Sequence, residues 1–159
     1  LVIEAANRIN AGMEASEIYS EVSSLVNKVQ SSFVIDSLEF LRAGGRCSAL
    51  SVLGANILKI KPCIEVNNIS GQMSVGKKYR GDLNKVLEQY IKDKLSSFDN
   101  IRTDKIFITH TMQSNEQINK ILDYIKSLNT FNNIYETKAG STIFSHCGPN
   151  TLGILFMTE

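Results

Sequence analysis

The residues of this chain with the densest potential for chemistry are Ser145-His146-Cys147-Gly148-Pro149-Asn150. His146 precedes a Gly-Pro turn, which predicts that its ring lies at the end of a sheet rather than in the middle of a strand. An imidazole in that place can donate a hydrogen bond to a carboxylate or phosphate, and it titrates near neutral pH. It could equally fix its own loop by bonding a backbone carbonyl. Both interpretations of His146 stay open on the sequence.

Cys147 stands beside His146 and could form a Cys–His nucleophile. Adjacent residues of an extended chain point to opposite faces, however, and a catalytic dyad normally gathers side chains from distant segments. The second histidine, His110, ends a predicted strand and could approach Cys147. We favour a small buried cysteine over a thiol nucleophile.

Gly44-Gly45-Arg46 is a second candidate site, because the N–H groups of a glycine turn and a following guanidinium can cradle an anion. The chain lacks the GxxxxGK[ST] and GxGxxG patterns, so nucleotide binding is unsupported. The simpler interpretation is a helix C-cap followed by a surface arginine.

Two weaker signals complete the search for chemistry. A basic run formed by Lys77, Lys78 and Arg80 is typical of a solvated strand edge. Two histidines and three scattered cysteines show neither zinc spacing nor a calcium-loop pattern, so no metal site is predicted.

Composition limits the classes of protein to which the chain can belong. Its 159 residues suit a single domain, and 43% hydrophobic with 21% charged residues is ordinary for a globular protein. A net charge of +1 argues against disorder and against a nucleic-acid binder. No apolar run approaches the roughly 20 residues of a membrane span. Three cysteines without CxxC spacing indicate free thiols, and therefore a cytoplasmic location.

The elements that must position these residues follow from hydrophobic periodicity. Glycines, proline and capping residues such as Asp82 and the Ser114/Gln117 pair mark their ends. Helices are predicted over residues 2–9, 15–30, 38–42, 49–60, 83–95 and 115–128, and strands over 32–35, 63–66, 72–79, 105–109, 132–137 and 151–157. Residues 139–150 are expected to form a loop. The pattern indicates an α/β domain with a mixed sheet, and a start inside a helix suggests a piece of a longer protein.

Four segments together resemble the DegV family of fatty-acid-binding proteins. They keep the family's order, and the similarity extends over essentially the whole chain. They are Ser32–Arg46 (SFVIDSLEFLRAGGR), Ile57–Pro62 (ILKIKP), Gly71–Gly81 (the K-x-R-G hairpin) and His146–Gly153 (HCGPNTLG). Asn150 stands where the family usually has glycine. Asparagine also tolerates the left-handed region, so the turn should survive.

The resemblance implies a fold, a partner and a role. Residues 1–159 would form a DegV-like C-terminal domain, a mixed β-sheet packed with helices, with residues 1–30 near the junction to an N-terminal domain. That absent domain would hold a Thr and a Ser that bind the lipid carboxylate. The protein would be a carrier without catalytic machinery or cofactor, which presents one long-chain fatty acid to a separate kinase subunit for acyl-phosphate formation in phospholipid synthesis.

By the same resemblance, His146 would contact the fatty-acid carboxylate and Arg46 would lie near the head group. Arg80 would engage the kinase or, transiently, the membrane surface. Residues 49–60 and the strand TLGILFM are candidate tunnel walls, with plain core as the alternative. A competing interpretation is the substrate-binding subunit of a dihydroxyacetone kinase, in which a histidine holds a small ketone covalently. A third is a scaffold half with no ligand of its own.

Overall fold

The computed structural model describes residues 1–45 and 60–159. Their helices and strands follow in the order α1 (Val2–Asn10), α2 (Ala15–Ser24), the short 3-10 helix η1 (Val26–Lys28), β1 (Val29–Val34), α3 (Glu39–Ala43), β2 (Ile60–Val66), β3 (Met73–Arg80), α4 (Leu83–Leu95), β4 (Lys105–His110), α5 (Asn115–Ser127), β5 (Asn133–Lys138), α6 (Ser141–Cys147) and β6 (Leu152–Met157).

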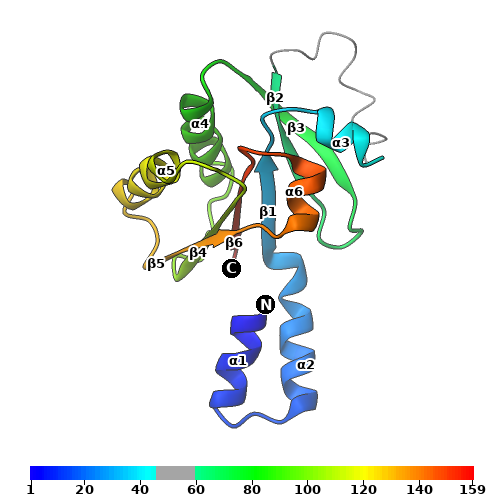
Figure 1. Ribbon diagram of the computed structural model, residues 1–159. Coiled ribbons are helices and arrows are strands. Elements are labelled where there is room, and N and C mark those ends of the chain that lie inside the picture. Colours follow the sequence, from blue (N-terminus) through cyan, green and yellow to red (C-terminus); the bar gives the residue numbers. More distant parts are fainter. Residues whose placement is uncertain (46–59) are drawn as a thin grey trace.

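Six strands form one mixed sheet in the order β3-β2-β1-β6-β4-β5 (Figure 1). Only β4 and β5 pair in parallel, and α5 connects them. The other neighbours are antiparallel. The mixed sheet and the strand–helix–strand unit are therefore confirmed. The last strand, β6, lies in the interior of the sheet between β1 and β4.

Helices cover the two faces of the sheet unequally. On one face, α4 and α5 pack over the larger hydrophobic core, whereas the short helices α3 and α6 lie on the other face (Figure 1). Tyr90 of α4 is fully buried in the larger core. Its hydroxyl donates to the Ser32 carbonyl at 2.7 Å and accepts from the Ile154 N–H at 3.3 Å, so α4 is tied to two central strands.

Local signals in the sequence explain several boundaries. The Asp82 carboxylate caps α4 by accepting from two backbone N–H groups, and the Ser114 hydroxyl accepts from the Gln117 N–H at 3.4 Å to cap α5. Gly45 follows α3 with φ 71°, as a glycine pair at a helix end predicts. Asn150 has φ 59°, which confirms that asparagine supports the left-handed turn.

The predicted helix over 15–30 is too long. Helix α2 ends at Ser24, and Val29 already begins β1, where it pairs with Met157. The apolar spacing that suggested one long helix continues across a turn of 3-10 helix into the strand. No residue of α2 is buried.

The predicted helix over 49–60 lies outside the described residues, apart from its last position. Ile60 belongs to β2 and pairs with Arg80, so the predicted end of that helix is wrong. Pro62 lies inside β2 rather than before it. The pairing with β3 shifts register between Pro62 and Ile64, and a proline without an N–H is tolerated at such an irregularity.

The predicted loop over 139–150 contains α6. Its sequence hides the helix, because Gly140 provides no side-chain cap and Thr142 and Ile143 are β-branched. Packing against α3 supplies what the local signals lack: Phe144 of α6 meets Phe40 of α3 edge-to-face, with ring centroids 6.4 Å apart.

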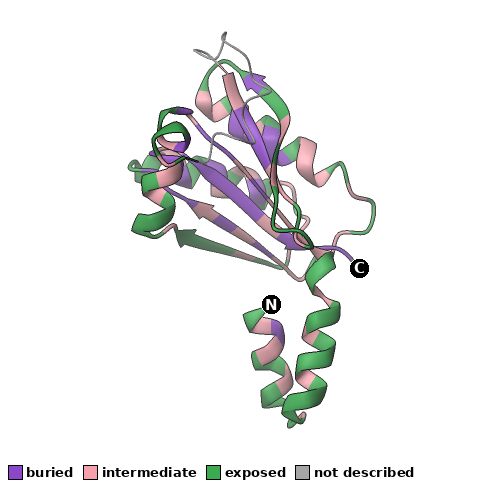
Figure 2. Ribbon diagram, turned by 90° about the vertical axis from the view of Figure 1, so that its right-hand side faces the viewer, coloured by how far each residue is buried: buried purple, intermediate pink, exposed green. Residues whose placement is uncertain are grey.

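Helices α1 and α2 form a hairpin that projects from the sheet (Figures 1 and 2). Its surface includes apolar side chains, with Val2 84%, Ile9 62% and Tyr19 77% exposed. Glu4 is the one buried residue of α1, and its carboxylate contacts Arg102 and Lys105 of the sheet domain. An ion cluster therefore anchors the hairpin.

Candidate functional site

A cavity of about 360 Å³ lies between the sheet and α6. Apolar groups dominate its walls, as in most small-molecule sites. It is lined by Ser31, Ser32, Phe33, Leu41, Met73, Thr109, His110, Thr111, Ala139, Ile143, His146, Cys147, Thr151, Gly153 and Leu155.

Alternation along β6 divides that strand between cavity and core. Gly153 and Leu155 line the cavity, whereas the side chains of Leu152, Ile154 and Phe156 belong to the larger core. Gly153 has Phe33 on one side and Thr109 on the other. Because it has no side chain, the sheet is hollowed there. The strand TLGILFM thus lines this cavity and contributes to the core on alternate residues, and its role as a tunnel wall stays a prediction.

His146 lies in the last turn of α6 and lines the cavity. This corrects the expected place of its ring at the end of a sheet. The Nδ1 atom is buried and finds no hydrogen-bond partner among the described residues. Gly44, at the end of α3, makes room for the ring: a Cβ there would lie 2.3 Å from Nδ1.

A second glycine, Gly148, makes room in the same way for a side chain of α3. Gly148 follows α6 with φ 76°, and a Cβ at that position would lie 2.4 Å from the ring of Phe40. Each of the two segments, LEFLRAGG and HCGP, thus places a side chain against a glycine of the other. The interlock explains why these segments meet although about one hundred residues separate them.

Two threonines fix the turn that follows His146. Thr111 donates from Oγ1 to the Gly148 carbonyl at 2.7 Å and accepts from the Thr151 N–H at 2.9 Å. Thr151 in turn donates from Oγ1 to the Cys147 carbonyl at 3.0 Å. All these groups are buried, so the turn is held rigidly against the end of β4.

Sequence reasoning missed a polar cluster beside this turn. Asp36 pairs with Lys61, and Asn150 donates from Nδ2 to the Asp36 carboxylate at 3.1 Å. The three residues come from the SFVID, IKP and GPN segments. The available signal was a charged residue of each sign inside otherwise apolar segments.

The arrangement does not support a thiol nucleophile. Burial raises the pKa of the Cys147 thiol, and it raises the pKa of Cys63 to about 11. His110 is engaged elsewhere: its Nδ1 accepts from the Met112 N–H at 3.1 Å, which leaves Nε2 to donate to Glu136 at 3.1 Å. A protonated thiol without a base is a poor nucleophile, and Cys147 is the small buried cysteine that we favoured.

Of the three predicted site residues, the structure describes His146 and Arg80, and only His146 lines the cavity. Arg46 lies outside the described residues. Arg80 is exposed at the end of β3, an edge strand, and does not line the cavity. In residues 1–45 and 60–159, no group of three or more His, Cys, Asp and Glu side chains could hold a metal ion. Within the same residues, no helix has the length and apolar character to cross a membrane.

Comparisons with known proteins agree on one family. The model of a family described as uncharacterised protein, DegV family, matches residues 1–159. A DegV domain-containing protein of Clostridium perfringens is 31% identical over 159 residues, which are 100% of this chain and 54% of that protein. One from Caldanaerobacter subterraneus is 28% identical over 158 residues, 98% of this chain and 54% of that protein. The chain thus spans about half the length of these relatives.

Solved structures show the same fold. A DegV family protein of Thermus thermophilus, described by its fatty-acid binding, superimposes with a TM-score of 0.82 at 20% identity, covering 99% of this chain and 55% of that one. The fatty acid kinase B3 protein of Streptococcus pneumoniae, loaded with linoleic acid, gives a TM-score of 0.81 at 16% identity, with 99% and 54% covered.

Proposed function

The chain belongs to the DegV family, and we propose that it is the C-terminal domain of a carrier that binds one long-chain fatty acid and presents its carboxylate to a separate kinase subunit. The observation that carries this proposal is a histidine at an apolar cavity large enough for part of an acyl chain. Fatty acids in the solved relatives from Thermus thermophilus and Streptococcus pneumoniae support it.

His146 is suited to orient a carboxylate. Its buried Nδ1 has no donor or acceptor opposite it in the described residues, so a proton on that atom would be an unsatisfied N–H. The tautomer with the proton on Nε2 avoids this and offers an N–H donor for a ligand. Gly44 leaves the space that the ring occupies, because it has no side chain.

The tail sets affinity and the head group sets orientation. A palmitoyl-sized tail has about 14 methylenes at about 0.8 kcal/mol each, or roughly 11 kcal/mol of burial before ordering costs. A charge-assisted hydrogen bond from His146 is worth about 1.5–3 kcal/mol. The rest of the head-group site would come from an N-terminal domain, with residues 1–30 near the junction and Arg46 near the head.

Arg80 is our candidate for contact with the kinase subunit or the membrane surface. Within the basic run, Lys77 is already paired with Asp93 at 2.6 Å. Lys78 and Arg80 form no ion pair with any other described residue, and both are exposed on the edge strand β3. Exposed cations of this kind can steer a carrier toward an acidic partner or an anionic lipid surface.

The small-molecule alternative is less well supported. A dihydroxyacetone-binding site must satisfy several hydroxyl and carbonyl groups in a small volume, whereas Phe33, Met73 and Leu155 make this cavity predominantly apolar. Retention of a covalent triose adduct after borohydride treatment would favour that alternative.

The test replaces His146 in the protein at its full natural length. We expect H146A to weaken fatty-acid binding about 10- to 150-fold, the value of one charge-assisted hydrogen bond, in a fluorescent-lipid displacement assay. Ser145→Ala is the matched control, because Ser145 is an exposed neighbour on α6 whose hydroxyl only donates to the Thr142 carbonyl. An unchanged affinity of H146A for the fatty acid would show that His146 does not contact the carboxylate.

A further inference from the structure

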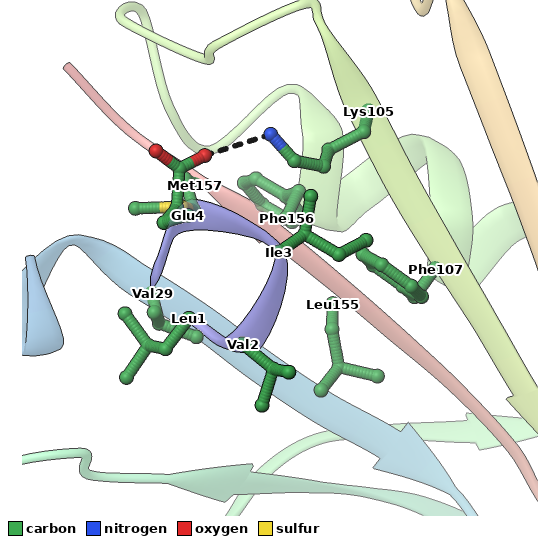
Figure 3. A pocket seen from close by; sticks show the side chains of 10 residues that line it. All are labelled: Leu1, Val2, Ile3, Glu4, Val29, Lys105, Phe107, Leu155, Phe156 and Met157. Carbon is green, nitrogen blue, oxygen red and sulfur yellow. Dashed lines mark hydrogen bonds and ion pairs between the residues drawn. The ribbon is translucent and has the colours of Figure 1, made fainter. Parts of the chain in front are cut away.

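We propose that a second cavity, at the opposite end of the same sheet face, receives the methyl end of the acyl chain, and that Ile3 of α1 limits the chain length. This inference rests on the proposed function. The second cavity measures about 300 Å³ and lies where α1 begins (Figure 3). It is lined by Leu1, Val2, Ile3, Glu4, Val29, Lys105, Phe107, Leu155, Phe156 and Met157.

The two cavities lie along one continuous strip of the sheet. Leu155 lines both of them. On β1, Phe33 lines the first cavity and Val29, on the same face of the strand, lines the second. On β4, Thr109 lines the first cavity and Phe107 lines the second. Leu155 pairs with Ser31 of β1 on one side and with Phe107 of β4 on the other. It is the next residue of β6 after Gly153 on this face of the sheet.

The length of this strip matches an acyl chain. Gly153 and Met157 are four residues apart, which is about 13 Å at the rise of an antiparallel strand. One leaflet of acyl chains spans about half of a hydrocarbon core of about 30 Å, or roughly 15 Å. A chain whose carboxylate lies near His146 would therefore reach the second cavity with its last methylenes.

Ion pairs close the far end of the strip. Lys105 donates to the Glu4 carboxylate at 2.8 Å, and this pair is part of the lining (Figure 3). A longer acyl chain would have to place apolar carbons against the buried ion pairs. That contact would remove water from the charged groups without giving them new hydrogen-bond partners, and it would therefore cost free energy. Ile3, next to Glu4, extends over the cavity toward Phe107, and its apolar side chain takes no part in the ion pairs (Figure 3).

The experiment compares Ile3→Trp with Ile9→Trp in the protein at its full natural length. Affinities are measured for saturated acids of 12 to 18 carbons. Each displaced methylene should cost about fourfold in affinity, so I3W should lose about 15-fold for an acid that extends two methylenes past the new wall, while the shortest acids bind as before. Ile9 lies on the same helix, 62% exposed and outside the cavity, so I9W should retain the original preference.

A second measurement locates the tail directly and does not depend on a variant. A fatty acid with a diazirine at its methyl end is photolysed in the wild-type complex, and labelled peptides are identified by mass spectrometry. Labels on residues 1–3 or 155–157 are expected. Binding with labels elsewhere, or an I3W profile equal to the wild type, overturns the tail site and leaves the carrier function standing. Either of these outcomes would fit a protein segment, rather than the acyl chain, filling the second cavity. No binding of any acid by the wild type overturns both proposals.

Discussion

The position of the His146 ring depends on a missing side chain at residue 44. Nδ1 occupies the space in which a Cβ of Gly44 would lie, at 2.3 Å. A side chain at residue 44 would therefore have to displace the imidazole from this position. A glycine is therefore required here for reasons of space rather than of backbone angle.

We expect Gly44→Ala to weaken fatty-acid binding by about tenfold or more, because displacing His146 forfeits a bond worth about 1.5–3 kcal/mol. Isothermal titration with a fluorescent or natural fatty acid would measure the loss. Gly140→Ala is the matched control, since a Cβ at that position has nothing within 4 Å. Equal affinities of the two variants would mean that the ring does not depend on Gly44.

At the scale of single residues, the sequence motifs predicted a role for His146, which lines the cavity, but gave no sign of the residues around it. The histidine was visible because a titratable side chain beside Gly-Pro is unusual. Asp36, Lys61 and Asn150 were individually unremarkable, and only the fold brings them into one polar cluster. Pairing across such sequence separations has no local signature.

Among the elements, α1 has an unusual attachment. Its buried contact is an ion cluster in which the Glu4 carboxylate accepts from Arg8 at 3.1 Å, Arg102 at 3.1 Å and Lys105 at 2.8 Å. Burial alone would raise the pKa of Glu4, but the hydrogen bonds from Lys105 and Arg8 and the surrounding positive charges lower it from 4.5 to about 2.

The sign of this shift predicts how α1 responds to acid. A carboxylate with a depressed pKa in the folded state contributes its full stabilisation above pH about 4.5 and loses it as the pH falls toward about 2. We expect the backbone resonances of α1 to report detachment in that window before the sheet unfolds, in an amide NMR titration. Asp104, whose pKa is also lowered within this cluster, contributes in the same direction.

Removing the negative charge of Glu4 by substitution should detach α1 as low pH does. Glu4→Gln should destabilise the docked helix by about 1.5–3 kcal/mol at neutral pH and flatten the acid transition of α1. Glu116→Gln is the control, because Glu116 pairs only with Lys120 on the surface of α5. A wild-type-like acid transition in E4Q would show that other groups hold α1.

Elements were predictable where periodicity and caps coincided, as in α4, α5 and the hairpin of β2 and β3. They were not predictable where tertiary packing overrides local preference. Helix α6 forms through its contact with α3, and Val29 leaves a helical pattern because it pairs with β6. The mixed sheet was correct as a class, but its strand order depends on contacts between the ends of the chain.

For the whole molecule, the strip between α6 and α1 is an apolar surface of the sheet that carries two cavities. Phe33, Phe107 and Leu155 line these cavities, and all three side chains are half-buried. The proposed N-terminal domain would cover it, and a tail held on one side only would keep much of its surface in water.

We therefore expect the 159-residue chain alone to retain no fatty acid in native mass spectrometry after expression in bacteria, while the protein at its full natural length retains one. Lipid extraction of both samples provides the control for losses during ionisation. A fatty acid bound at full occupancy to the 159-residue chain would show that the second domain is dispensable for affinity.

The interior place of β6 has a consequence for biosynthesis. The strand that joins β1 to β4 follows both of them in the sequence, so the two halves of the sheet cannot be bridged until β6 has been synthesised. Until Leu152, Ile154 and Phe156 emerge, the larger core lacks its centre and its apolar helices stay exposed to chaperones. A premature stop codon before Leu152 would leave two unjoined sheet fragments rather than a slightly shortened protein.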